Sequence, residues 1–490
     1  MRLKNATQQV AAAGAPEPTR RRESVLAILT SPLKKIASQS VAVASGRDME
    51  QSLPRDDSVL ARLPPEILNI VFEYCLGGVR QRLSYNAPIW TLLHVCSLWR
   101  TIALSNRFLW SNIDAVVSQP VRRGQSNFSA PKPTRSEKKA FLHMLKTYLE
   151  HADGALLDIR IGLAYHGTCR RILRMLWEHR QQWLAVCLIG QGVGVASLLN
   201  DMGARLGCGM SNLQRVELCY DGTPDILLPM LPAPALHTII GGPIFQVRAS
   251  NAPAWSQITN YTGPAFAYVF VLALMPNLEI ANIEDVIDRA MERGNGEIKC
   301  DHPNLKVLRL LRSRSESCLC ELTAPRLRLL ECAQMAKAGY PIVLGFIRRS
   351  GCSLSELVIK HGVDDKCLYK MIQLSPELQT LTLEDWFSAS EDGRALSGDI
   401  LEMLARNPTA VSQLSVLEIE RRQRRAYRRP RDSFVPLVRS LAALEPLRLQ
   451  KVRVSVPEPD VDAAFEFIRD GCAPLPATIT VVVKDVCAWS

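Results

Sequence analysis

The chain has 490 residues, of which 22% are charged and 47% belong to the apolar set, and its formal net charge is +11. At about 100 to 200 residues per domain, this length predicts two to four units or one elongated repeat array. No apolar run approaches the roughly 18 residues that a bilayer span needs, so we expect neither a membrane-spanning protein nor a membrane partner.

Most of the positive charge lies in two short segments. Residues 1–55 carry a formal charge of +5 and residues 421–431 carry +7, which leaves −1 for the rest of the chain. A nucleic-acid-binding domain typically has a basic surface, and the body of this chain is close to neutral. We therefore do not expect a nucleic-acid partner.

Residues 1–57 are rich in Ala, Ser, Gln, Arg and Pro, and their apolar islands are short, so we expect a disordered basic segment. It has no apolar core before Pro16, which argues against a secretory signal and favours a cytoplasmic or nuclear location, or both. The 14 cysteines are accordingly expected to be reduced thiols that pack as small apolar side chains.

A compact apolar block follows at residues 58–117. Pro64 and Pro65 suit the first turn of a helix, and Gly77 and Gly78 stop it. The apolar side chains of this helix recur at helical spacing: Ile67, Ile70, Val71 and Tyr74. We expect a second helix over residues 87–104 that is apolar around most of its surface. A block this small cannot cover such a helix, so the rest of the chain or another protein must cover it.

Several short motifs of this block come in a fixed order: Leu-Pro-Pro-Glu-Ile-Leu at 63–68, Val-Cys at 95–96, Trp-Arg at 99–100 and Leu-Trp at 109–110. In this combination the block resembles an F-box, and it is most similar to the form found in mushroom-type fungal proteins. The connection from Gly78 to Pro88 is longer than the family pattern. The resemblance implies a three-helix bundle that docks on the Skp-type adaptor of an SCF-type cullin–RING ubiquitin ligase.

Carried over by position, the resemblance implies that these residues bind the adaptor: Leu63, Pro64, Ile67, Leu68, Leu92, Leu93, Val95, Cys96 and Trp99. The alternative is an ordinary buried helical hairpin that packs on the following domain.

Residues 118–138 are rich in Pro, Ser, Arg and Lys and are predicted to be a linker. From residue 139 to 490 the frame Leu-x-x-φ-x-φ, in which φ is apolar, recurs at spacings of 22 to 42 residues. The clearest copies begin at Leu213, Leu305, Leu327, Leu354, Leu378 and Leu414, and weaker ones at Leu156, Leu184, Leu236, Leu278 and Leu449.

This pattern resembles a leucine-rich-repeat array, in which stacked units build a shared core that no single unit can form. The expected fold is α/β: the F-box bundle followed by an irregular leucine-rich-repeat-like solenoid with a parallel strand ladder. Two departures, long spacings and the absence of the usual Asn after each frame, predict broken units near residues 240–275 and 385–410. The alternative is a generic α/β protein with a chance set of apolar strands.

The middle residue of each φ-x-φ strand points away from the core because side chains alternate along a strand. We expect this row to form the surface that binds a protein target of unknown identity. It comprises Arg160, Glu217, Arg309, Glu331, Thr382 and Glu418, together with Val358 and Arg453.

Motifs for catalysis or cofactors are weak. Gly190, Gly192 and Gly194 imitate a dinucleotide-binding turn, but the third required glycine is replaced by Val195, and a simple turn after a repeat strand explains them. A zinc site on Cys300, His302, Cys318 and Cys320 competes with ordinary strand packing, which we favour. We therefore expect a non-catalytic protein without cofactor or metal.

The arginine run at 421–431 leaves three interpretations open: a solvated loop, a nuclear-import signal and a site for an acidic partner. Taken together, the sequence predicts a substrate receptor that brings a target to a ubiquitin ligase. The second hypothesis is a repeat scaffold without a ligase role, and the third, an NAD-type enzyme, rests on the glycine motif alone.

Overall fold

The computed structural model describes residues 63–76, 80–116, 134–162, 166–190, 209–220, 233–241, 255–263, 272, 275–284, 300–312, 319–333, 339–360, 365–386, 403–404, 406–422, 449–457 and 479–484. The chain divides into two compact units. Unit 1 comprises Met1–Val117 and Pro133–Ile159, and unit 2 comprises Ser118–Lys132 and Arg160–Ser490. The N-terminal segment predicted to be disordered and most of the predicted linker lie outside the described residues.

Unit 1 begins with three α-helices where the sequence predicts two. Helix α2 (Pro65–Leu76) starts at the predicted prolines and ends before Gly77. The single helix expected over 87–104 is instead two, α3 (Pro88–Val95) and α4 (Ser97–Ser105). Cys96 between them is extended, and its Sγ accepts a hydrogen bond from the backbone N–H of Trp99 at 3.4 Å. Its sulfur thus caps α4 as Ser or Asn usually does, and no Pro or Gly announces the break.

The 3₁₀ helix η3 (Arg107–Trp110) follows α4, and the short strand β1 (Gln81–Arg82) pairs in parallel with β2 (Asn112–Ala115). Helix α5 (Arg135–His151) completes the unit, which therefore extends beyond the boundary predicted at residue 117. The side chain of Tyr148 on α5 packs against Trp110 and Trp90, with ring centroids 5.1 and 6.2 Å apart. An ion pair between Arg80 Nε and Asp158 Oδ1 at 2.8 Å closes the same unit.

Helix α5 starts inside the predicted linker because a capping box sets its first residue. The Thr134 hydroxyl accepts a hydrogen bond from the N–H of Glu137 at 3.2 Å, and the Glu137 carboxylate accepts one from the N–H of Thr134 at 2.7 Å. The backbone hydrogen bond from Thr134 lowers the pKa of the Glu137 carboxyl. The Thr-x-x-Glu spacing is a known helix start, although its basic and polar surroundings favour a linker by composition.

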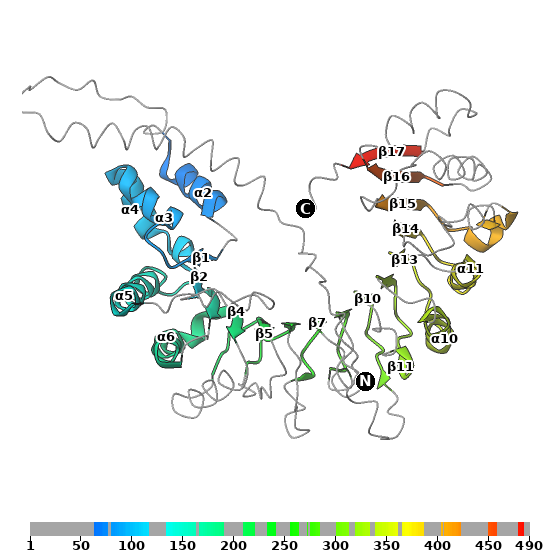
Figure 1. Cartoon of the computed structure of the whole chain (residues 1–490), viewed down its shortest axis with the longest axis horizontal. Coiled ribbons are helices and arrows are strands. Elements are labelled where there is room, and N and C mark those ends of the chain that lie inside the picture. The colour runs from blue at the N-terminus through cyan, green and yellow to red at the C-terminus, as the bar shows by residue number, and fades with distance from the viewer. Residues whose placement is uncertain are drawn as a thin grey trace, which may run out of the picture. The chain divides into compact units, whose positions relative to one another are not determined.

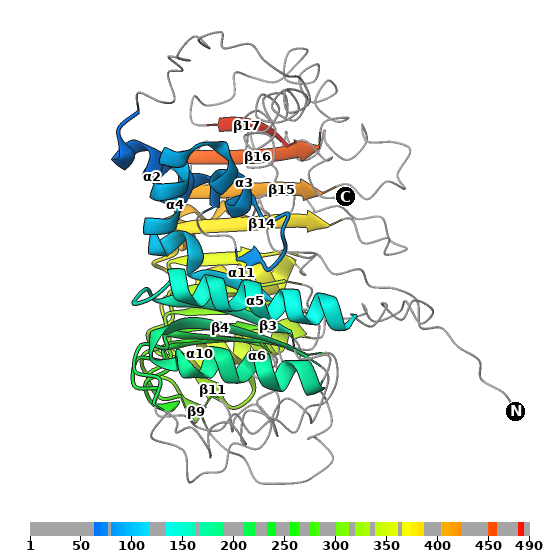
Figure 2. The same cartoon turned by 90° about the vertical axis from the view of Figure 1, so that its left-hand side faces the viewer.

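Unit 2 is α/β and is built around a long parallel sheet, whose strand order follows the chain. Strand β3 (Leu157–Gly162) contains the boundary between the units. The strands after it are β4 (Trp183–Gly190), β5 (Arg215–Tyr220), β6 (Thr238–Gly241), β7 (Asn260–Gly263), β8 (Ile280–Ile283), β10 (Val307–Leu310), β12 (Leu329–Cys332), β13 (Glu356–Ile359), β14 (Thr380–Trp386), β15 (Val416–Arg422), β16 (Lys451–Pro457) and β17 (Ile479–Lys484). Figure 2 shows β14 to β17 side by side and pointing the same way.

The helices described in unit 2 are α6 (His166–Glu178), α10 (Tyr340–Ser350) and α11 (Asp365–Gln373), with 3₁₀ turns η4 (Arg180–Gln182) and η9 (Pro408–Val411). Strands β9 (Cys300–Asp301) and β11 (Leu322–Thr323) form a separate pair. Helices α10 and α11 lie on one side of the sheet (Figure 1). Among the described residues, no helix combines the length and apolarity that a bilayer crossing requires.

The recurring frame of the sequence marks where the strands of the parallel sheet begin. Most strands begin two residues after a frame leucine, and the N–H of that leucine usually donates to a carbonyl three residues earlier, as from Leu278 to Met275 at 3.0 Å. The residue after the leucine accepts two N–H groups from the next unit: the Glu279 carbonyl takes those of Lys306 and Val307. These bonds satisfy the backbone where each strand starts and hold one register along the sheet.

The sequence frame was wrong at three places. The interval 240–275, expected to be a broken unit, contains β7, whose frame opens with Ile258 in place of leucine and divides the longest spacing into 22 and 20 residues. At β4 the frame opens one residue earlier, at the buried Trp183 and not at Leu184. Leu156 is 43% exposed, whereas Leu157 is buried. Leucine alone therefore does not define the opening position, because any large apolar side chain can fill it.

The core of unit 2 lies between the sheet and the side that carries α10 and α11. Buried leucines occupy one register position on successive strands: Leu308, Leu330, Leu357, Leu381 and Leu417. Phe346 and Ile347 of α10 and Met371 of α11 belong to the same apolar cluster. This row explains why leucine recurs at the same frame position: Leu330, Leu357 and Leu381 each have a leucine in register on both neighbouring strands.

Candidate functional site

Exposed large apolar side chains are confined to unit 1 among the residues that the structure describes. They are Ile67, Ile70, Tyr74, Tyr85, Val95, Leu98, Phe108 and Leu156. Six of these belong to the helical segments α2, α3, α4 and η3. A group of large apolar side chains left in water on one small unit is a typical sign of a protein-binding surface.

Helix α2 shows how the surface arises. Leu68, Phe72 and Leu76 follow a four-residue spacing, and all three are buried. The opposite stripe, Ile67, Ile70 and Tyr74, is 44%, 61% and 64% exposed. An amphipathic helix normally exposes polar residues on the face away from the core. This helix has two apolar faces, and the core of its own unit uses only one of them.

Asn106 connects the end of α4 to the same helix. Its side-chain amide donates to Asn69 Oδ1 at 3.1 Å and to Glu73 Oε1 at 3.0 Å, both on α2. Its carbonyl oxygen Oδ1 also accepts the N–H of Phe108 at 3.1 Å, which starts η3. Phe108 is 66% exposed and therefore adds to the apolar surface beside α2. We call Ile67, Ile70, Tyr74 and Phe108 the α2 face.

The nine residues expected to bind an adaptor divide by burial. Pro64, Ile67, Val95 and Cys96 are exposed, and Leu63 and Leu92 are half-buried. Leu68, Leu93 and Trp99 are 1%, 8% and 8% exposed, so these three side chains hold the bundle together. Trp99, for example, packs edge-on against Phe72 with ring centroids 4.9 Å apart.

The motif-based assignment missed Ile70, Tyr74, Leu98 and Phe108, which are all exposed. The helical spacing of Ile67, Ile70 and Tyr74 was visible in the sequence. What the sequence did not provide is which of the two apolar stripes of α2 faces the core. That choice depends on how α3 and α4 are placed by the break at Cys96.

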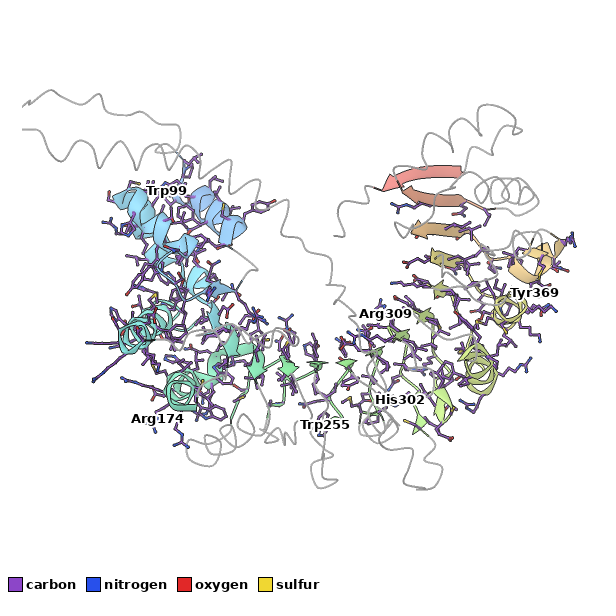
Figure 3. The ribbon with its side chains drawn as sticks, viewed as in Figure 1. Trp99, Arg174, Trp255, His302, Arg309 and Tyr369 are labelled. Atoms are coloured by element: carbon purple, nitrogen blue, oxygen red, sulfur yellow. The ribbon has the colours of Figure 1, made fainter. Side chains whose placement is uncertain are left out.

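In unit 2, five of the six candidate target-binding residues lie in one register row across the sheet. Glu217 of β5, Arg309 of β10, Glu331 of β12, Thr382 of β14 and Glu418 of β15 belong to a row that neighbouring strands continue with Ile240, Thr262, Asn282, Val358 and Arg453. Arg160 is an exposed residue of β3. Figure 3 shows Arg309 on the side of the sheet opposite to Trp255 and His302, which are buried.

The middle of this row is linked by polar contacts from strand to strand. Asn282 Nδ2 donates to Thr262 Oγ1 at 2.8 Å, and Arg309 Nη1 donates to Asn282 Oδ1 at 3.2 Å. The Glu331 carboxylate forms two ion pairs. Arg309 Nε lies 3.1 Å from one carboxylate oxygen, and Lys360 Nζ lies 2.5 Å from the other. We call Thr262, Asn282, Arg309, Glu331 and Lys360 the polar row.

Towards the C-terminal strands the row is looser. Glu418 Oε1 and Arg453 Nη1 are 3.8 Å apart, and both side chains are about one-third exposed. Exposed ion pairs of this kind contribute about 0 to 1 kcal/mol to stability, so these groups remain available to a partner. The face therefore alternates positive, negative and neutral groups and carries no single sign of charge.

A second group of polar side chains lies on this face at β4 and β5. Cys187 pairs in register with Glu217, and Cys219 follows Glu217 by two residues and so shares its face. The two sulfurs are 3.9 Å apart, and Cys219 Sγ is 3.6 Å from Glu217 Oε1. The hydrogen bond from Cys187 lowers the pKa of Cys219, against burial and the Glu217 charge, which raise it.

Other sequence motifs are only partly described. Cys300 is buried on β9, Cys320 is exposed, and Cys318 lies outside the described residues. Burial lowers the pKa of His302 while the charge of Asp301 raises it. Gly190 ends β4, and the rest of the glycine motif lies outside the described residues. Arg421 and Arg422 end β15, and the remaining arginines of the run also lie outside.

Comparison with known protein families and with curated proteins found no match to this chain. The arrangement of its own residues is therefore what bears on function. Unit 1 offers an apolar helical face, and unit 2 offers a mixed polar face on a parallel sheet. Both are suited to contacts with other proteins.

Proposed function

We propose that this protein is a non-catalytic substrate-receptor subunit of an SCF-type cullin–RING ubiquitin ligase. In this proposal the block 58–117 is an F-box that docks on the Skp-type adaptor. The strands of the long sheet from β4 to β17, which exclude β9 and β11, are units of an irregular leucine-rich-repeat-like solenoid that binds a target protein. The protein would act in the cytoplasm, the nucleus or both.

The observation that carries the proposal is the α2 face. The side chains of Ile70, Tyr74 and Phe108 are each more than 60% exposed, although unit 1 contains a well-packed core beneath them. Transferring apolar surface from water to a partner yields about 25 cal/mol per Å², so a partner that covers this face gains a large part of its binding energy there. The ordered Leu-Pro, Val-Cys and Trp-Arg motifs on the same segments supply the family resemblance.

In such a complex the chemistry belongs to other subunits. The contribution of this chain would be proximity, because tethering raises the effective concentration of a target to the order of mM. The mixed charges of the polar row give that surface selectivity for a complementary target, since mismatched charges are repelled and unpaired polar groups are penalised on binding.

The test is binding of the full-length chain to purified Skp-type adaptor. The double variant Ile70→Asp with Tyr74→Asp places two carboxylates on the α2 face without touching the buried stripe. We expect its affinity for the adaptor to fall at least about 30-fold, the loss of one central hot spot. Trp99→Asp is unsuitable for this test because the Trp99 side chain is buried and the change would unfold the bundle.

The matched control is Leu156→Asp, which adds a carboxylate at an exposed leucine of the same unit outside the helical surface. It should bind the adaptor like the unchanged protein. Two results would contradict the proposal: no complex with the unchanged protein, or a complex that the double variant forms equally well. Thermal unfolding of each variant shows that the fold is retained.

One observation favours a repeat scaffold without a ligase role. Trp90 and Trp110 of the helical block pack against Tyr148 of α5, so part of the block is covered by its own chain. A scaffold whose helical block packs within its own chain predicts that the block recruits no adaptor. The unchanged protein then forms no complex with the adaptor, and the double variant behaves like it in this assay.

A further inference from the structure

The strands β4 and β5 bring together two thiols and a carboxylate that are far apart in the sequence. Cys187 Sγ, Cys219 Sγ and the Glu217 carboxylate form a group whose candidate ligand atoms all lie within 4.8 Å of one another. Among the described residues this is the one such cluster of three or more His, Cys, Asp or Glu side chains.

Two of the three ligand separations match those around one metal ion. Zinc binds sulfur at about 2.3 Å and carboxylate oxygen at about 2.0 to 2.2 Å in a tetrahedral arrangement, which places two sulfur ligands about 3.8 Å apart and a sulfur and an oxygen about 3.5 Å apart. The observed separations are 3.9 Å between the sulfurs and 3.6 Å between Cys219 Sγ and Glu217 Oε1. A disulfide needs its sulfurs at about 2.05 Å, so the pair as it stands is not a disulfide.

The local backbone holds these ligands in place. Cys187 and Glu217 are register partners in the parallel pair β4–β5, and Cys219 extends from the same strand as Glu217. Cys187 is 1% exposed, whereas Cys219 is exposed and Glu217 is half-buried. The cluster thus has a buried ligand at one end and opens to solvent at the other, as sites with a free coordination position do.

We infer that Cys187, Cys219 and Glu217 form a zinc site with three protein ligands and a fourth position open to water or to a side chain of a bound protein. Two thiolates and a carboxylate favour zinc, because thiolates select zinc or copper(I) and carboxylates suit harder cations. This inference does not depend on the proposed ligase role. It extends the chemistry of the sheet face beyond hydrogen bonds and ion pairs.

The test is zinc retention by the full-length protein. The purified chain is incubated with Zn²⁺, dialysed and analysed for metal content by mass spectrometry. We expect one Zn²⁺ per chain, and we expect Cys219→Ser and Cys187→Ser to lose it. Cys320→Ser is the matched control, because Cys320 is an exposed thiol outside the cluster, and it should retain the metal.

A second measurement uses Cd²⁺ as the probe. Cadmium bound by thiolates gives an ultraviolet charge-transfer absorption, which should appear in the unchanged protein and in Cys320→Ser and be reduced in Cys219→Ser. Because Cys219 is exposed, its replacement by Ser leaves the core intact, and an unchanged melting temperature checks this. The inference would be overturned if the unchanged protein retained no zinc, or if Cys219→Ser retained as much zinc as the unchanged protein. It would also be overturned if Cys187 and Cys219 formed a disulfide under reducing conditions and the protein took up no metal.

Discussion

Gly241 has no room for a side chain. It ends β6 with φ of +74°, and a Cβ built there would lie 2.2 Å from the Leu218 carbonyl oxygen of β5. Non-glycine residues rarely adopt this backbone conformation, and here the approach of the neighbouring strand adds a clash with backbone. Glycine is therefore required at this position for two independent reasons.

We predict that Gly241→Ala destabilises the protein by about 1 to 3 kcal/mol, the usual cost of a strained backbone position. The matched control is Gly345→Ala in α10, where a Cβ would meet no atom within 4 Å. That change should stabilise by about 1 kcal/mol, because alanine favours a helix over glycine. Urea unfolding of both variants measures the difference, and an equal effect of the two changes would refute the argument.

At the residue scale, the sequence predicts which side chains form the register row of the sheet better than it predicts which side chains form the α2 face. Alternation in the φ-x-φ strands placed Arg309, Glu331 and Glu418 in one row, because a parallel ladder with a buried leucine at each step permits one register. The thiol pair was missed, since Cys187 and Cys219 are neighbours only once β4 and β5 pair. In addition, a frame that opens at Leu184 is one residue late and assigns Cys187 to the core, whereas the frame in the structure opens at Trp183.

At the scale of elements, the composition of the sequence did not predict helix α5, because its first residues lie in a segment whose composition is typical of a linker. Its Tyr148 ring lies among Trp90 and Trp110, and burial raises the pKa of the Tyr148 hydroxyl above its ordinary value. That hydroxyl has no hydrogen-bond partner among the described residues. The ring therefore contributes packing, and its polar atom contributes a desolvation cost.

We predict that Tyr148→Ala destabilises the protein by about 3 to 5 kcal/mol, as for other large aromatic side chains truncated in a core. Tyr148→Phe removes only the buried hydroxyl and should leave stability unchanged or slightly raised. Chemical unfolding followed by tryptophan fluorescence distinguishes them. A large loss of stability in Tyr148→Phe would mean that the hydroxyl makes a hydrogen bond after all.

The helix break at Cys96 shows what sequence patterning leaves undetermined. After Pro88, apolar residues recur through positions 89–104 without a further proline or a glycine, and such a run predicts one helix. The structure ends α3 at Val95 and restarts with Cys96 as the cap of α4. A thiol cap carries little propensity of its own, so tertiary packing decides where the chain turns.

At the scale of the whole molecule, the division into units differs from the domain boundaries that composition suggested. Residues 133–159 belong with the helical block, although they comprise the end of the predicted linker and the start of the predicted repeat domain. The contact between Trp110 and Tyr148, at 5.1 Å between ring centroids, joins the two parts of unit 1 across that segment.

We predict that a protease site engineered within residues 118–132 can be cut without separating the fragments. The pieces should co-elute in gel filtration under native conditions, because the aromatic contacts between α5 and the helical block remain. Introducing Tyr148→Ala into the same protein should let the N-terminal fragment dissociate. Separation of the fragments with Tyr148 intact would show that unit 1 does not hold together through α5.

The polar row has a consequence for any molecule that settles on the sheet. The Glu331 carboxylate already contacts Arg309 and Lys360, and Arg309 also donates to Asn282. A charged group of a bound protein must displace one of these neighbours before it can contact Glu331 or Arg309. Its binding free energy is therefore only the difference between two similar contacts. A protein whose charges do not match this pattern loses more free energy than it gains on binding. A protein with a complementary pattern exchanges one set of ion pairs for another, so its affinity is modest and its specificity is high.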